Sequence, residues 1–184
     1  MVGLGEAGKN IVKLFKPHTK NYKIIIFDEN DGLDPKDSVE EYDEQEIKLK
    51  HKGLSKHDEA MLFVCGSGKV AGASLRVLEA LKGFKTTIVY IVPDLEFSST
   101  REQKRHRAHF GILQEYTRSG MINDMIILEN KKMFEVAGTG TTLKYFEKVN
   151  FLIYNTIQNI MYCRHVKPDF GRLHEKKEIS RIST

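Results

Sequence analysis

Two glycine-rich segments hold the residues of this chain that are best suited to bind an anion. The first contains Gly3, Gly5 and Gly8, and the second runs from Cys65 to Gly72 with the sequence CGSGKVAG. Each segment follows a short apolar run and precedes a stretch with helical spacing. Glycine lets the backbone take positive φ and approach a ligand closely, and the free amides that open a helix attract phosphate. Two such turns at one edge of a sheet predict a bound nucleotide.

The first segment taken alone has two other interpretations. Its G-x-G-x-x-G spacing, with Asp28 at the end of the next apolar run, is typical of a dinucleotide-binding fold in which the acid binds ribose. The same glycines could instead make only a tight turn between a strand and a helix. The second segment makes both interpretations less favoured, because a dinucleotide fold does not require another phosphate loop after a later strand.

Strands and helices are expected to alternate along the chain. Apolar runs predict strands at 2–4, 22–28, 60–65, 86–92 and 125–128, with a charged edge strand at 44–50. Helical spacing predicts helices at 9–16, 71–81, 98–118 and 142–163. This alternation predicts a three-layer α/β domain, in which a mostly parallel sheet has helices on both faces and binds ligands at the carboxyl ends of its strands.

The composition fits one compact domain in the cytoplasm. The 184 residues carry a net charge of +4, which is too small to indicate nucleic-acid binding. The apolar runs are far shorter than a bilayer requires and no leader precedes them, so we expect no membrane insertion. The seven histidines are scattered. Without acidic or thiolate neighbours, we expect His106 and His109 to face solvent and to bind no metal.

The order of these features resembles the nucleotide-binding domain of the tubulin/FtsZ GTPase family. The resemblance covers nearly the whole chain, from a glycine loop ending at Asn10, through an acidic loop and a second glycine loop, to a basic helix, a strand and a long final helix. Residues 101–116 resemble the basic helix of the bacterial members, and residues 125–133 resemble the strand and turn that follow it. The resemblance implies a cytoplasmic protein that binds GTP or GDP, with Mg²⁺ as an optional companion, and assembles into filaments.

The second glycine segment departs from the family pattern G-G-G-T-G-[ST]-G. The aligned residues here are 66–72, and three of the five glycines remain. Lys69 can replace lost donors by a charge-assisted contact to phosphate, whereas Val70 cannot take positive φ cheaply, so the path of the loop must differ. The alternative is a degenerate loop that only caps a helix. Glu6 also brings an acid near the phosphates, for which a cation or Lys9 must compensate.

Two helices complete the nucleotide site that the resemblance implies. In the family an acid opening the basic helix reaches the ribose, and a basic residue one turn later reaches phosphate; the matching positions are Thr100 and Lys104. The acid is missing here, with Glu102 as a nearby substitute, and a solvated helix face is the alternative. On the final helix Asn150 matches the residue that reads the guanine edge, and it could equally be a polar boundary residue. Phe146 is expected in the core.

The resemblance implies a nucleotide site with a weakened catalytic loop. The implied nucleotide-binding residues are Gly5, Glu6, Gly8, Asn10, Gly66, Gly68, Lys69, Gly72, Lys104 and Asn150. Of the catalytic motif N-x-D-x-x-[DE] only Asp169 remains, with Lys167 and Arg172 at the other two positions. One carboxylate gives weak general-base help, and Asp169 could instead pair on the surface. Hydrolysis is therefore expected to be weak or absent.

The domain boundaries follow from the same comparison. We expect residues 1–164 to form the nucleotide-binding domain and residues 165–184 a loop and polar tail, without the second domain of the family. Three functional interpretations remain open. The chain is a divergent guanine-nucleotide-binding protein that assembles head to tail with itself or with other subunits, a nicotinamide-dependent Rossmann oxidoreductase, or a structural subunit that kept the fold and lost the ligand.

Overall fold

The fold is built on a six-stranded parallel sheet. A computed structural model of the chain describes residues 1–18, 20, 22–29, 59–138, 142–167 and 179–182. The strands are β1 (Val2–Leu4), β2 (Ile25–Phe27), β3 (Glu59–Cys65), β4 (Lys85–Val92), β5 (Asp124–Glu129) and β6 (Ile179–Ile182). They lie in the order β2-β1-β3-β4-β5-β6, and every neighbouring pair is parallel.

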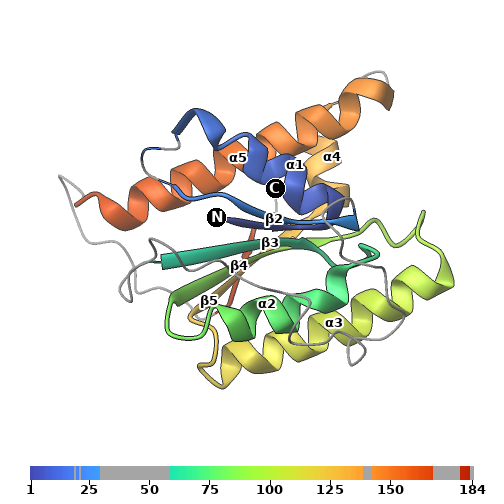
Figure 1. The fold of residues 1–184 in the computed structure, drawn as a ribbon. Helices are drawn as coiled ribbons and strands as arrows, with labels where there is room; N and C mark the ends of the chain where they lie inside the picture. The colour runs from blue at the N-terminus through green and yellow to red at the C-terminus, as the bar shows by residue number, and fades with distance from the viewer. Residues whose placement is uncertain (19, 21, 30–58, 139–141, 168–178, 183–184) are drawn as a thin grey trace.

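Helices cover both faces of this sheet (Figure 1). On one face lie α1 (Gly5–Lys13), α4 (Asn130–Ala137) and α5 (Thr142–His165), and on the other lie α2 (Ser74–Ala80) and α3 (Thr100–Arg118). Short 3₁₀ turns at Lys16–His18 and Ala71–Ala73 follow α1 and precede α2. The predicted three-layer α/β fold with helices on both faces is confirmed.

Two apolar cores join the layers, one on each face of the sheet. Successive side chains of a strand point to opposite faces. Phe63 and Val89 therefore pack with α1 and α5, whereas Leu62 and Ile88 pack with α2 and α3. Because the central strands are buried on both faces, their sequences read as continuous apolar runs.

The basic helix α3 begins at the cap that the sequence predicts. The Ser99 hydroxyl accepts a hydrogen bond from the Glu102 amide at 3.3 Å, and the Glu102 carboxylate accepts one from the Ser99 amide at 2.7 Å. This capping box satisfies two amides that would otherwise lack partners at the helix start. The cap fixes where α3 begins at the carboxyl edge of the sheet, next to the second glycine segment.

Several boundaries differ from those expected. α1 starts at Gly5 instead of residue 9, so the first glycine segment forms the first turn of the helix. Residues 130–137 form α4, which the sequence analysis did not predict. The expectation of a polar tail is wrong for Ile179–Ile182, because this segment pairs with the open edge of β5 as β6. The edge strand predicted at 44–50 lies outside the described residues.

No helix in the described part of the chain combines the length and the apolar character that a bilayer span needs. α5 is the longest of the described helices at 24 residues, and polar side chains such as Lys148 and Gln158 lie outside its apolar stripe.

Candidate functional site

The two glycine segments meet at the carboxyl edge of the sheet. β1 lies between β2 and β3, and the helices that follow β1 and β3 cover opposite faces (Figure 1). Such a switch point opens the crevice in which α/β proteins bind ligands. A cavity of about 670 Å³ lies there, lined by residues of both glycine segments, the end of β2, and helices α3 and α5. This cavity is the candidate functional site.

Close packing explains two of the three glycines in the first segment. A Cβ on Gly3 would lie 2.7 Å from the Gly8 carbonyl oxygen, and a Cβ on Gly8 would overlap the Phe63 carbonyl oxygen on β3. Gly5 has a positive φ of +68° and makes the turn into α1. Gly3 and Gly8 therefore bring α1 close to the sheet. Gly8, predicted to bind nucleotide, is buried beneath the cavity and is not part of its lining.

The first amides of α1 open into the cavity. The N-cap residue is Leu4, which makes no side-chain cap hydrogen bond. Gly5, Glu6 and Ala7 all line the cavity. The first amides of a helix have no acceptor within the helix, and they carry the positive end of its dipole. They are the kind of donor that a phosphate group requires.

An ion-pair network surrounds the start of α1. The Lys9 ammonium lies 2.7 Å from Glu6 and also pairs with the buried carboxylate of Asp28. Hydrogen bonds to Asp28 and then Glu6 raise the pKa of Lys9, whereas hydrogen bonds from Lys9 and Asn10 lower the pKa of Glu6. Lys9 thus compensates for Glu6, as the sequence requires. Asp28, the ribose-binding acid of the dinucleotide interpretation, is already paired with the Lys9 ammonium.

The second glycine segment takes a different path. The structure describes all of residues 66–72, and none of them has positive φ. Val70 has a φ of −103° and is buried, with its side chain beside Gly5. A 3₁₀ turn then leads into α2, which has only seven residues and therefore a short dipole. This segment is a packed turn, in which the amides of Gly66, Gly68 and Ala71 already donate to carbonyl oxygens of the chain.

A buried polar cluster lies beneath the second segment. A Cβ on Gly66 would overlap the Tyr90 hydroxyl and lie 2.7 Å from His106 Nδ1. Tyr90 Oη and His106 Nδ1 are hydrogen-bonded at 2.9 Å, and His109 Nε2 is hydrogen-bonded to the Ser74 hydroxyl of α2. The expectation that both histidines face solvent is wrong, because their side of α3 packs under this segment. Burial lowers the pKa of both histidines, which favours their neutral forms.

Arg105 holds the second segment from α3. Its Nη1 donates to the carbonyl oxygens of Ser67 and Gly68 at 3.1 and 3.2 Å. Its Nε is buried and makes no hydrogen bond to a described residue. Lys104, which the resemblance places on phosphate, is exposed and lies outside the cavity lining. Adjacent helix residues point about 100° apart, so the register of α3 assigns the inward direction to Arg105.

Lys69 is the cation in the cavity wall. Its Nζ lies 3.5 Å from Glu29 Oε1, and its side chain is 71% exposed. An exposed ion pair of this length contributes little to stability. The ammonium can therefore turn toward a ligand at small cost.

α5 brings a ring and an amide to the cavity. Phe146 and Asn150 lie about one helical turn apart, so they share a face, and both line the cavity. The expectation that Phe146 is in the core is wrong, because its side chain is 63% exposed. Val149 and Ile153 occupy the buried side of α5 instead. The Asn150 amide can both donate and accept hydrogen bonds beside this ring.

The cavity therefore unites part of the predicted site. Six predicted residues line it: Gly5, Glu6, Asn10, Gly68, Lys69 and Asn150. Gly66 and Gly72 are buried outside the lining, as Gly8 is, and Lys104 is exposed outside it. Glu29, Cys65 and Ser67 line the cavity without having been predicted. Their positions in the sequence could have predicted them, because each of these residues follows or ends a strand at the carboxyl edge of the sheet. Asp169 lies outside the described residues, and its catalytic role stays a prediction.

The cavity lining is acidic. Glu6, Asp28, Glu29 and Glu102 stand against one lysine, Lys69. Hydrogen bonds from the α3 cap lower the pKa of Glu102. Acids near an anion raise the electrostatic cost of binding it unless a cation accompanies it. No cluster of three His, Cys, Asp or Glu side chains within the described ranges is arranged to hold a metal ion.

Comparison with known proteins bears on the fold. No protein-family model matches the chain, and no curated protein matches its sequence. Among solved structures the chain is similar to CetZ from Methanosaeta thermophila strain DSM 6194, a tubulin/FtsZ-family protein, with a TM-score of 0.61 and 12% identity. The fold is tubulin/FtsZ-like. The match covers 92% of this chain and 56% of CetZ, so the chain spans little more than half the length of that neighbour.

Proposed function

We propose that this protein binds a guanine nucleotide, GDP or GTP, in the cavity at the carboxyl edge of β1 and β3, and that it assembles with copies of itself. One observation carries the proposal: a single cavity is lined both by the start of α1, whose amides are suited to phosphate, and by Phe146 and Asn150 of α5, which are suited to a base. Its volume of about 670 Å³ falls within the usual range of ligand sites, roughly 300 to 1,000 Å³.

The phosphate end is the start of α1. The amides of Glu6 and Ala7 belong to the first turn of a helix without a side-chain cap, and Lys69 lines the same cavity. A phosphate there would accept backbone hydrogen bonds and gain a charge-assisted bond from the lysine. Arg105 supports this end indirectly, because it holds the carbonyl groups of the neighbouring turn.

The base end is the exposed face of α5. A purine could pack against Phe146, whose ring has no reason to be exposed if it served only the core. Guanine presents a donor and an acceptor on one edge, and the Asn150 amide can meet both. Adenine also presents a donor and an acceptor on one edge, so the choice of guanine follows the family resemblance, and titration with ATP tests it.

The acidic lining affects how the phosphates would bind. The single charge of Lys9 offsets one of the two charges of Glu6 and Asp28, and Glu29 is a further acid beside Lys69. We propose that Mg²⁺ arrives with the nucleotide and screens this charge. Affinity for GTP should therefore increase when Mg²⁺ is added.

Hydrolysis is proposed to be slow. In the sequence around Asp169, Lys167 and Arg172 replace polar and acidic residues of the family motif. Neither cation can accept a proton from water at neutral pH. We expect little phosphate release from GTP, and faster release in Lys167→Asn/Arg172→Asp would support this explanation.

Calorimetric titration with GDP, GTP, ATP and NAD tests the proposal. We expect binding of the guanine nucleotides, and at least about tenfold weaker binding of GDP by Asn150→Ala, the scale of one lost hydrogen-bonding group. Asn155→Ala, on the same helix and outside the lining, is the matched control. Tight binding of NAD without guanine nucleotide would overturn the proposal in favour of the oxidoreductase interpretation.

A second candidate function is a structural subunit without a ligand. The acidic lining and the pairing of Lys9 with two carboxylates favour it, because both reduce the attraction of the cavity for an anion. This candidate predicts no heat of binding with any of the four nucleotides while the protein still self-associates.

A further inference from the structure

We propose that the loop after β4 (residues 93–99) docks into an apolar groove of a second copy of this chain. The groove lies at the amino ends of the strands, opposite the loop. The inference rests on the self-association proposed above and names its contact. It uses a second cavity and an exposed loop, neither of which belongs to the candidate nucleotide site.

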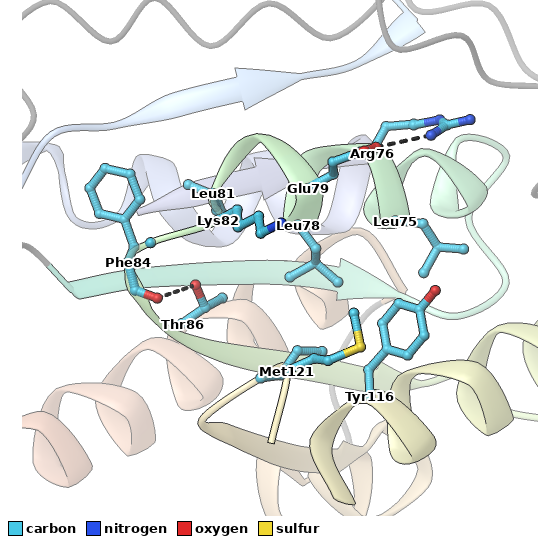
Figure 2. A pocket seen from close by; sticks show the side chains of 12 residues that line it. Leu75, Arg76, Leu78, Glu79, Leu81, Lys82, Phe84, Thr86, Tyr116 and Met121 are labelled. Carbon is cyan, nitrogen blue, oxygen red and sulfur yellow. Dashed lines mark hydrogen bonds and ion pairs between the residues drawn. The ribbon is translucent and has the colours of Figure 1, made fainter. Parts of the chain in front are cut away.

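The groove lies between α2 and the carboxyl end of α3 (Figure 2). Its volume is about 580 Å³. Leu75 and Leu78 of α2 face Tyr116 and Met121 across it, as Figure 2 shows. Met121 is 69% exposed, although it is a large apolar side chain. Exposed apolar surface in a groove indicates a site for another apolar group.

The loop after β4 presents such a group. The Phe97 side chain is 87% exposed and Leu95 is 39% exposed. The loop is nevertheless held in place, because Gln103 Nε2 donates to the carbonyl oxygens of Leu95 and Ser98 at 3.0 and 3.1 Å. Ser98 Oγ also donates to the Asp94 carbonyl oxygen at 2.6 Å. A loop fixed in this way loses little conformational entropy when it binds.

The groove and the loop lie at opposite ends of the molecule. The groove includes Thr86 at the start of β4, and the loop follows Val92 at its end. The eight residues of β4 span roughly 25 Å at the usual rise per residue. Figure 1 shows that α3 begins near the carboxyl ends of the strands and ends near their amino ends. A protrusion that fits a cavity at the other end of the same molecule forms a heterologous contact, which repeats from copy to copy.

Charge favours the same orientation. The loop carries Asp94 and Glu96, of which Glu96 pairs with Lys131 of its own copy. The groove rim carries Lys82, which is exposed and has no ion pair with a described residue. Arg76 and Glu79 lie on the same rim and pair with each other. An acidic loop would therefore approach a rim with an available cation, which aids correct encounter.

Sedimentation velocity over a range of protein concentrations tests the contact with two single variants. Phe97→Ser removes the inserted ring, and Met121→Glu places an acid in the groove opposite the acidic loop. Each variant should associate at least about tenfold more weakly than the wild-type protein, since the burial of one large apolar side chain is lost. Phe151→Ser, which removes a ring that is 56% exposed on α5, should associate like the wild type.

A mixture of the two variants gives the sharper result. Phe97→Ser retains the groove and Met121→Glu retains the loop, so an equimolar mixture should form dimers that cannot extend. The contact is overturned if the wild type stays monomeric, if Phe97→Ser associates normally, or if the mixture associates no better than its components. GDP titration of every variant separates the two proposals. A variant that loses association but still binds GDP bears only on the contact between copies. Absent GDP binding with intact association would contradict the nucleotide site alone.

Discussion

The two glycine segments look alike in sequence and differ in structure. The first opens a nine-residue helix with a positive φ at Gly5 and no side-chain cap, and an ion-pair network surrounds it. The second has no positive φ across residues 66–72, leads through a 3₁₀ turn to a seven-residue helix, and covers neutral, buried groups. Both segments line the cavity, and the second is in addition held from α3 by Arg105 and packed on the Tyr90 ring.

This difference separates two uses of glycine. Gly5 provides a backbone conformation, whereas Gly8 and Gly66 provide space for a neighbouring backbone or ring. A spacing pattern cannot separate the two uses, because both require the absence of a Cβ. We therefore propose that the first segment binds phosphate and that the second is mainly structural.

The largest expected effect is on stability in Gly8→Ala. A Cβ there would overlap the Phe63 carbonyl oxygen, and backbone cannot move aside easily. We expect a loss of about 3 kcal/mol in the free energy of unfolding, at the upper end for overpacking. Urea denaturation measures it. Gly111→Ala on α3 is the control, because its Cβ would meet nothing within 4 Å and should stabilise the helix by up to about 1 kcal/mol. Equal stability of Gly8→Ala and wild type would remove the packing explanation.

Gly66→Ala should have the next largest effect. The new Cβ would displace the Tyr90 hydroxyl from His106, and we expect a loss of about 2 kcal/mol. The contact predicts coupling: in Gly66→Ala/Tyr90→Phe the loss should be smaller than the sum of the single losses, because the clashing hydroxyl is gone. Strict additivity in denaturation experiments would show that Gly66 does not press on this ring.

The histidine beneath the second segment should make stability depend on pH. Burial lowers the pKa of His109 to about 3, so the unfolded chain binds a proton that the folded chain excludes. This contribution is complete above the ordinary histidine pKa of about 6.5 and is lost as pH falls toward 3, at up to about 1.4 kcal/mol per pH unit. Denaturation curves from pH 7 to 4 should show a shallower decline for His109→Gln than for wild type. Parallel declines would mean that His109 is not held neutral.

The smallest of these effects concerns Lys69 and nucleotide affinity. An exposed lysine contributes about 1 kcal/mol, so Lys69→Ala should weaken GTP binding about fivefold and leave unfolding unchanged. Lys104→Ala is the comparison that the structure offers, since Lys104 lies outside the cavity lining and should have no effect. A larger loss in Lys104→Ala than in Lys69→Ala would restore the position that the family resemblance assigned to phosphate.

Sequence reasoning predicted the class of fold well and the site only in part. Apolar runs fixed the central strands, and the Ser99 cap fixed the start of α3, because both signals are local. The burial of His106 and His109 could not be read from α3 alone, since it depends on which side of the helix meets the second segment. The exposure of Phe146 was missed for the same reason. β6 was missed because this four-residue strand forms by pairing with β5, and its own sequence is too short to predict a strand.

Hydrogen–deuterium exchange with and without GDP tests the central assignment most directly. If phosphate binds at the start of α1, GDP should slow exchange most strongly at the amides of residues 5–7, with weaker protection at residues 67–70 and additional protection around Asn150. Lys69→Ala should keep this pattern at a higher GDP concentration. Strong protection of residues 67–70 with none at residues 5–7 would contradict the account, because it would make the second segment the phosphate site.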